Sequence, residues 1–301
     1  MDDMVKFAPE LRRRVCDIFC AIGAAQSVSE RVADSLVESN LMGHDSHGII
    51  RVPFYVRAIR DGRLKPGGEI RIARQSASTA VLDCDWAFGQ VAAKQGIELA
   101  MAKARQHDIA MVTLYRCQHI GRLGEYVAMA AEQGFVGLVL CNGSGPGGTV
   151  APFGGIGRAI GTDPIAWGVP STGKPVFADF ATSAVAHGKV QVAHDKGLDI
   201  PLGWILDKDG QPTQNPQDLF EGGMMLPFGG HKGYALGVIV ELLGGGLSGA
   251  GVSLQPDYQW SQGTVMMAIN VEAFQPLDAF RVVPRIESGI VLNFDIGKIS
   301  R

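Results

Sequence analysis

One short stretch carries an unusual density of chemically active side chains, and the rest of the chain can be placed around it. It reads Gly43-His44-Asp45-Ser46-His47-Gly48-Ile49-Ile50-Arg51. Gly48 predicts a turn, because glycine tolerates backbone angles that strain other residues. If a helix begins near Ser46, His47 and Arg51 lie four residues apart and share one of its faces. Pro53 fits only a first helical turn or a kink, so the shared face is a hypothesis.

The side chains of this stretch suit a small anionic substrate. Histidine exchanges a proton near neutral pH, and arginine can bind a carboxylate through two parallel hydrogen bonds. Together they predict a substrate that carries a carboxylate beside a hydroxyl or carbonyl group. A metal site is an alternative, formed by His44 and His47 with His119 or His231, with Asp45 as an oxygen ligand. The sequence does not place the third ligand that this alternative needs.

Composition sets the broad class of protein. The chain has 301 residues, of which 46% are hydrophobic and 19% charged, as in a soluble protein of one large or two ordinary domains. A net charge of -3 gives no reason to expect a nucleic-acid partner. The five cysteines are scattered without a C-x-x-C pair, which favours reduced thiols over a disulfide framework or a zinc ribbon. No signal core or membrane-length apolar run occurs, so a cytoplasmic location and no membrane partner are expected.

Hydrophobic spacing predicts an alternation of helices and strands. Pro66-Gly67-Gly68 breaks the chain and marks a candidate domain boundary. Helices are expected at 8–22, 27–40, 52–59, 90–106, 122–133 and 184–193, and strands within 69–84 and at 109–114 and 135–141. A helix at 234–243 is apolar almost all round, which predicts a place in the core, and Gly244-Gly245-Gly246 is expected to end it. Residues 142–173 indicate loops and short strands, and the chain after Gly251 gives no clear pattern.

Other motifs point to ligand binding with different strength. Gly155-Ile156-Gly157-Arg158-Ala159-Ile160-Gly161 resembles a dinucleotide fingerprint, but it neither follows a good strand nor opens a helix, so a Rossmann turn is not expected. His119 stands between a strand and a helix, where ligands are often bound. Lys232, beside glycines at a helix start, suits an anionic group or a solvated surface. Histidines 107, 187 and 194 are interpreted as structural.

The ordered motifs together resemble the malate/L-lactate dehydrogenase family that lacks a Rossmann fold, which includes ureidoglycolate and sulfolactate dehydrogenases and cyclic-imine reductases. The resemblance runs from about residue 8 to 275 and is closest to a bacterial 2-hydroxycarboxylate dehydrogenase. It is carried by 43–48 with Arg51, 119–122 (HIGR), 151–155 (APFGG), 161–164 (GTDP), 179–183 (DFATS), 188–189 (GK) and 230–234 (GHKGY).

The resemblance implies an α/β (α+β) fold and an oxidoreductase that is usually a homodimer. Residues 71–234 would form a non-Rossmann cofactor domain on a largely antiparallel mixed sheet. Residues 1–70 and 235–301 would form a discontinuous, mainly helical domain. The implied reaction moves a hydride between NAD or NADP and a small 2-hydroxy or 2-oxo acid.

The same resemblance assigns roles to individual residues. His47 is implied as the proton donor or acceptor, Ser46 as its orienting neighbour and Arg51 as the clamp for the substrate carboxylate. His119 is implied in both catalysis and cofactor binding. The other implied cofactor residues are Ile120, Gly121, Arg122, Leu123, Thr162, Asp179, Phe180, Ala181 and Lys232. No metal is implied.

Two departures from the family pattern leave alternatives open. Asp163 stands where the family usually has asparagine, which removes a hydrogen-bond donor. The tail is short by some tens of residues, and a Pro-Gly-Glu segment has only 283–287 (VPRIE) as its nearest counterpart. The short tail makes a cofactor-binding protein without turnover one alternative. Reduction of a cyclic imine acid by the same residues is a second, and a metal-dependent hydrolase is a third.

Overall fold

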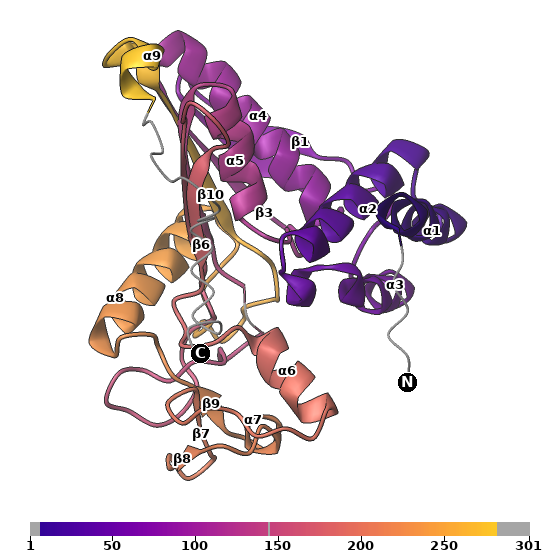
Figure 1. Cartoon of the computed structure of the whole chain (residues 1–301), viewed down its shortest axis with the longest axis vertical. Coiled ribbons are helices and arrows are strands. Elements are labelled where there is room, and N and C mark those ends of the chain that lie inside the picture. Colours follow the sequence, from indigo (N-terminus) through magenta and orange to yellow (C-terminus); the bar gives the residue numbers. More distant parts are fainter. Residues whose placement is uncertain (1–6, 144, 282–301) are drawn as a thin grey trace.

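The computed structural model describes residues 7–143 and 145–281, and a seven-stranded sheet forms its centre (Figure 1). Strands β2 and β3 pair in parallel, and every other neighbouring pair is antiparallel. The expected α/β fold with a mixed, mostly antiparallel sheet is confirmed. In sheet order the strands are β1 (Arg71–Gln75), β2 (Thr79–Asp83), β3 (Ile109–Tyr115), β10 (Thr264–Asn270), β4 (Phe135–Cys141), β5 (Ile165–Val169) and β6 (Val176–Phe180).

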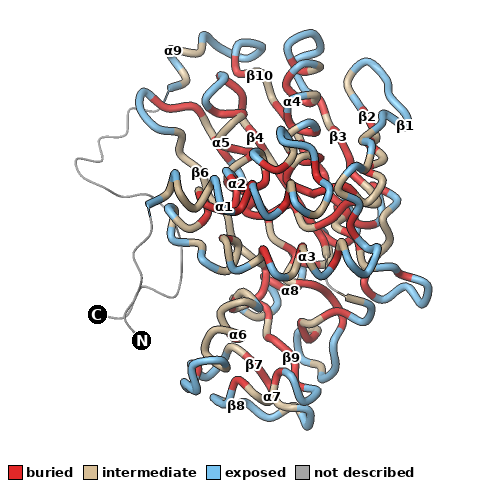
Figure 2. The backbone as a smooth tube through the Cα atoms, turned by 90° about the vertical axis from the view of Figure 1, so that its right-hand side faces the viewer, coloured by how far each residue is buried: buried red, intermediate tan, exposed pale blue. Residues whose placement is uncertain are grey.

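Helices α4 (Gly89–His107) and α5 (Gly124–Glu132) cover one face of this sheet (Figure 1). Their inner positions are mainly alanine and glycine, which lets the helices approach the strands closely. Gly168 of β5 shows how close, because a Cβ built there would lie 2.5 Å from the carbonyl oxygen of Val127 on α5. The resulting layer is the most deeply buried part of the molecule (Figure 2).

Strand β10 was missed by the sequence analysis although it lies in the middle of the sheet, between β3 and β4. Its residues Thr264, Val265 and Met266 are buried in succession, so the strand has no polar face and no alternating pattern. The expected division at 71–234 had placed these residues with the N-terminal helices. That division stays a prediction, while β10 itself belongs to the sheet.

The N-terminal helices α1 (Ala8–Ala21), α2 (Gln26–Leu41) and α3 (Val52–Arg60) form a second core, in which Phe19 and Tyr55 are fully buried. Their predicted positions are confirmed within a few residues. This helical layer is joined to the sheet layer through Glu125 of α5. The Glu125 carboxylate accepts hydrogen bonds from Arg31 Nη1 at 2.5 Å and Ser35 Oγ at 2.6 Å, both on α2.

Helix α8 (His231–Val240) corrects the prediction that it would be enclosed in the core. It packs on the other face of the sheet through Val240, while Ile239 and Leu242 are 48% and 53% exposed. The glycine triplet does not end the helix, because the chain continues as a π-helical segment, Glu241–Leu247. These glycines allow close packing instead: a Cβ on Gly245 would lie 2.2 Å from the carbonyl oxygen of Gly251.

A smaller unit lies below the sheet in Figure 1 and has its own core around Ile205, Leu219 and Met225. Its three-stranded sheet has the order β8-β7-β9. No helix in the described part of the chain is long and apolar enough to cross a membrane. The remaining elements are α6 (His187–Asp195), β7 (Ile205–Leu206), β8 (Pro212–Thr213), α7 (Gln217–Phe220), β9 (Met224–Met225), η4 (Val271–Ala273) and α9 (Leu277–Phe280).

Replacing Gly168 with alanine is expected to reduce the free energy of unfolding by about 1–3 kcal/mol, because the new Cβ would collide with the backbone of α5. Gly173 provides a matched control, since a Cβ there meets nothing within 4 Å. Urea unfolding of both variants measures the effect. Equal midpoints for Gly168→Ala and the wild type would contradict the close packing of α5 on β5.

Candidate active site

The His47 and Arg51 side chains come from two short 3-10 turns rather than from one helix. The turns are η1 (Asp45–His47) and η2 (Ile49–Arg51), so the predicted shared helical face is wrong. Gly48 separates them with a φ of -88°, an angle open to any residue. Glycine is required for space, because a Cβ would lie 2.2 Å from Asn40 Oδ1.

Asn40, near the end of α2, fixes both turns through its side-chain amide. Its Nδ2 donates to Asp45 Oδ1 at 2.6 Å, and its Oδ1 accepts from the backbone N–H of Ile49 at 2.9 Å. One amide therefore holds η1 by its donor and η2 by its acceptor. The missing side chain of Gly48 is what allows Asn40 to reach both.

Although they lie on separate turns, the side chains of His47 and Arg51 both interact with Ser46. Arg51 Nε donates to the carbonyl oxygen of Ser46 at 2.6 Å, and Ser46 Oγ lies 3.0 Å from His47 Nδ1. Burial, followed by the positive charge of Arg51, lowers the pKa of His47 to about 3. The ring is therefore neutral at pH 7. No hydrogen bond or ion pair within the described residues engages the terminal nitrogens of Arg51.

His119 joins this group from the segment between β3 and α5. Its ring stacks on that of His47 with centroids 5.5 Å apart and an angle of 23° between the planes. Tyr55 Oη lies 2.7 Å from His119 Nδ1, and Gln90 Nε2 donates to Tyr55 Oη at 2.6 Å. Burial, then the charge of Arg51, lowers the pKa of His119 well below its ordinary value.

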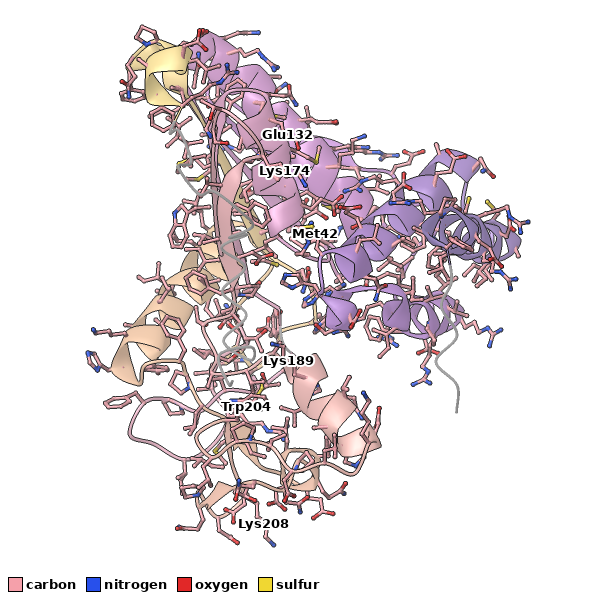
Figure 3. The ribbon with its side chains drawn as sticks, in the orientation of Figure 1. Met42, Glu132, Lys174, Lys189, Trp204 and Lys208 are labelled. Carbon is pink, nitrogen blue, oxygen red and sulfur yellow. The ribbon has the colours of Figure 1, made fainter. Side chains whose placement is uncertain are left out.

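A cavity of about 340 Å³ opens beside these groups, between the helical layer, the sheet and α6. Among the residues expected in the site, it is lined by Ser46, His47, Gly121, Arg122, Leu123, Thr162, Asp179, Phe180 and Ala181. Lys189 and Trp204, which the sequence analysis did not assign to the site, also line it (Figure 3).

Four of the expected residues do not line this cavity. Arg51 and His119 adjoin two residues that do line it, Ser46 and His47. The Ile120 side chain is buried in the sheet core. Lys232 is exposed at the start of α8.

The cavity wall near Arg122 offers unsatisfied hydrogen-bond donors. Arg122 is 6% exposed, and its Nε and Nη1 groups have no hydrogen-bond partner among the described residues. Asp179 Oδ2 accepts the backbone N–H of Gly124 at 2.7 Å, which fixes this carboxylate beside Arg122. Buried N–H groups without partners are costly, so a polar or anionic ligand group would satisfy them. The residues present thus fit a phosphate- or amide-bearing cofactor.

Comparison with known proteins identifies the chain at this point. The profile of the malate/L-lactate dehydrogenase family matches residues 7–283. The chain belongs to this family. It is accordingly a dehydrogenase of the malate/lactate type, as the motifs had indicated.

The chain is similar in sequence to individual members of the malate/L-lactate dehydrogenase family over most of their length. It is 38% identical over 283 residues to a malate dehydrogenase of Pyrococcus abyssi, covering 90% of this chain and 77% of the relative. It is 39% identical over 262 residues to hydroxycarboxylate dehydrogenase B of Escherichia coli O157:H7, covering 86% and 72%. The structure of delta1-piperideine-2-carboxylate reductase from Pseudomonas syringae superposes with a TM-score of 0.82 at 34% identity, covering 89% of this chain and 82% of that one.

Sequence reasoning missed the residues that support the site in this family member. Asn40 lies three residues before the signature stretch, but within a segment whose spacing indicates only a helix. Gln90 and Trp204 lie far from the stretch in sequence, and nothing in their local patterns sets them apart. The motif at 161–164 did point to one feature of the wall, the non-family aspartate at 163. Among the described residues no group of three or more His, Cys, Asp or Glu is arranged to hold a metal ion. His231, one suggested ligand, packs against Phe153 with ring centroids 5.7 Å apart.

Asp163 is enclosed behind the cavity wall, between Thr162 and Pro164, and faces a second buried carboxyl group, Glu241. Glu241 accepts hydrogen bonds from Asn142 Nδ2 at 3.0 Å, from the Ser253 N–H at 3.1 Å and Oγ, and from the Gly161 N–H at 3.2 Å. Neither Asp163 oxygen makes a well-formed hydrogen bond to the described residues. Burial, then the charge of Glu241, raises the pKa of Asp163 well above its ordinary value, which favours the protonated form.

The Asp163 carboxyl group is expected to make the protein less stable as the pH rises. An acid with a raised pKa holds its proton more tightly in the folded chain, so its stabilising effect is full below the unfolded value of 3.8 and is lost as the pH rises through the folded value. The slope is at most about 1.4 kcal/mol per pH unit. Asp163→Asn should remove this slope and be more stable than the wild type at pH 8.

Urea unfolding between pH 5 and pH 9 measures this dependence, with Asp209→Asn, at an exposed position, as the control. The control should keep the wild-type slope. If Asp163→Asn also keeps it, Asp163 does not carry the proton.

Proposed function

We propose that this dehydrogenase transfers a hydride between NAD or NADP and a small 2-hydroxy or 2-oxo acid. The observation that supports this most is the pairing of a neutral imidazole, His47, with an arginine whose terminal nitrogens are free of partners in the described structure. The guanidinium of Arg51 would bind the substrate carboxylate through two parallel hydrogen bonds. This places the adjacent C2 oxygen toward His47.

In this proposal His47 exchanges the proton of the C2 oxygen. During oxidation the neutral ring accepts the hydroxyl proton, and during reduction the protonated ring returns it. Ser46 Oγ, 3.0 Å from Nδ1, holds the ring so that Nε2 is the exchanging atom. The bound substrate carboxylate would offset the positive charge of Arg51, the second cause of the low His47 pKa after burial, and so raise that pKa.

The cofactor would lie along the part of the cavity formed by 121–123, Thr162 and 179–181, with the backbone of His119 and Ile120 behind it. When bound, its nicotinamide ring exchanges the hydride with C2 of the substrate. Buried Arg122 would donate its unpartnered N–H groups to the cofactor. Lys232, outside the cavity at the start of α8, would serve a distant anionic part of the cofactor. The site would thus stand on a mixed, largely antiparallel, non-Rossmann sheet.

Reduction of a cyclic imine acid is the second candidate, supported by the similarity to the named delta1-piperideine-2-carboxylate reductase. The same Arg51 clamp and His47 proton would serve a C=N bond. Binding of a cofactor without turnover is the third. Following NADH and NADPH fluorescence while 2-oxo acids and cyclic imine acids are added separates the three, because only a reductase consumes the bound cofactor.

His47→Ala is expected to lower kcat by roughly 10²–10⁴-fold, the usual contribution of a positioned acid-base group, with cofactor affinity unchanged.

Arg51→Lys tests the other half of the site, because it keeps the charge but loses the two-pronged geometry, so the KM for the acid should rise. Steady-state kinetics and cofactor titration on both variants separate the two roles. Wild-type turnover in His47→Ala would exclude it as the acid-base group.

We also propose that two copies of the chain associate through the sheet face on which α8 packs, in the part of that face that α8 does not cover. On this face Met111, Met267, Leu138 and Trp167 form one cross-strand row. Trp167 is 39% exposed and the other three are half-buried. A row of large apolar side chains on a sheet is typical of an interface, and a second copy would bury it symmetrically. This agrees with the homodimer that the family resemblance implies.

Trp167→Glu is expected to shift the protein from dimer to monomer, because it places a charge within the proposed interface. Leu198→Glu is the control, since Leu198 is more exposed, at 57%, but lies after α6, away from this face. Sedimentation velocity measures the mass of each. A wild type that sediments as a monomer, or a Trp167→Glu variant that stays dimeric, would overturn the proposal.

A further inference from the structure

Two side chains behind the cavity, Gln90 and Tyr55, form a hydrogen-bonded chain that ends on His119. Gln90 Nε2 donates to Tyr55 Oη at 2.6 Å, and Tyr55 Oη lies 2.7 Å from His119 Nδ1. Gln90 and Tyr55 are 0% and 1% exposed, so water does not compete for these bonds. Gln90 stands at the start of α4, and Tyr55 on α3, so the chain spans the junction between the helical layer and the sheet layer.

The direction of these two hydrogen bonds determines which nitrogen of His119 carries the proton. Burial raises the pKa of Tyr55, so the phenol keeps its hydrogen and can donate. Since Tyr55 Oη already accepts from Gln90, its own O–H points to His119 Nδ1. A neutral imidazole that accepts at Nδ1 carries its single proton at Nε2.

The opposite orientation of the Gln90 amide is disfavoured by the groups around it. In the observed orientation only Oε1 is left without a partner in the described structure. Turning the amide over would instead bury an NH₂ group without acceptors, and unpaired N–H groups are rarer in protein interiors than under-satisfied carbonyl oxygens. Tyr55 would then donate to Gln90, and His119 Nδ1 would have to donate to Tyr55. The orientation of the Gln90 amide therefore determines the direction of both hydrogen bonds.

We infer that Gln90 is a positioning residue, which acts through Tyr55 to keep His119 protonated at Nε2. His119 would then present an N–H group on the ring stacked against His47. A fixed donor at this place can stabilise negative charge that develops on the C2 oxygen, while His47 exchanges the proton. This role rests on the proposed 2-hydroxy acid chemistry, but the protonation pattern of His119 does not depend on it.

Gln90→Glu tests the inference at pH values where the new side chain is ionised, because a carboxylate can only accept from Tyr55 and so reverses the direction of the hydrogen bonds. We expect nitrogen-15 NMR of labelled protein to show His119 protonated at Nε2 in the wild type and at Nδ1 in the variant. With substrate, kcat should fall about 10²-fold, the usual loss for one positioned donor, while substrate KM and cofactor affinity stay the same. Gln118→Glu is the matched control, since Gln118 is equally buried but donates to the Arg63 carbonyl.

A double-mutant cycle with Tyr55→Phe separates positioning from a general structural effect. If Gln90 acts through Tyr55, adding Gln90→Glu to Tyr55→Phe should change kcat by less than about twofold. Gln90→Leu provides a second route if the buried carboxylate prevents folding, and it should give His119 a mixture of the two protonated forms. An unchanged His119 spectrum in Gln90→Glu and Gln90→Leu, or an equal loss of kcat with and without Tyr55, would overturn the inference. If no acid is turned over by the wild type, the NMR result still decides it.

Discussion

The site depends on one side-chain amide, that of Asn40, which holds both short turns of the signature stretch. It can do so only because Gly48 leaves room for it, and α2 carries it to the right place because Glu125 ties that helix to α5. The position of His47 relative to the sheet therefore depends on helices α2 and α5 and on a few short hydrogen bonds. Acid-base groups need this kind of support, since small displacements of a reacting group cost large factors in rate.

Electrostatics then select the kind of ligand. Arg51 and Arg122 bring positive charge to this site. Burial, then the charge of Arg51, lowers the pKa of both His47 and His119, which favours their neutral forms. Asp179, the carboxylate beside Arg122, is held by a backbone N–H of α5. A site with two guanidinium groups and neutral imidazoles favours an anion that carries an exchangeable proton. The same balance keeps the imidazoles able to accept a proton in the absence of substrate.

The sequence was a good guide wherever the pattern was local. Helical spacing located α1 to α5, and the chemistry of Ser46, His47 and Arg51 predicted their convergence, although through the wrong local geometry. Three failures share a physical cause, namely burial or close packing decided by distant residues. Strand β10 is apolar on both faces and so shows no polar–apolar alternation, the glycines at 244–246 allow contact rather than ending a helix, and α8 keeps an exposed apolar side. Supporting residues such as Gln90 carry no local signal at all.

Strand β10, which comes near the end of the described chain, links formation of the site to formation of the whole sheet. Gln262, just before it, donates its N–H to the carbonyl oxygen of Cys117 at 2.9 Å and accepts the N–H of Ile120 on its Oε1 at 2.8 Å. These two bonds enclose the segment that carries His119. Since β10 inserts between β3 and β4, which precede it by more than a hundred residues, His119 is fixed only after this long-range pairing is made. Loop closure of that length is slow, so the catalytic geometry should appear together with the complete sheet.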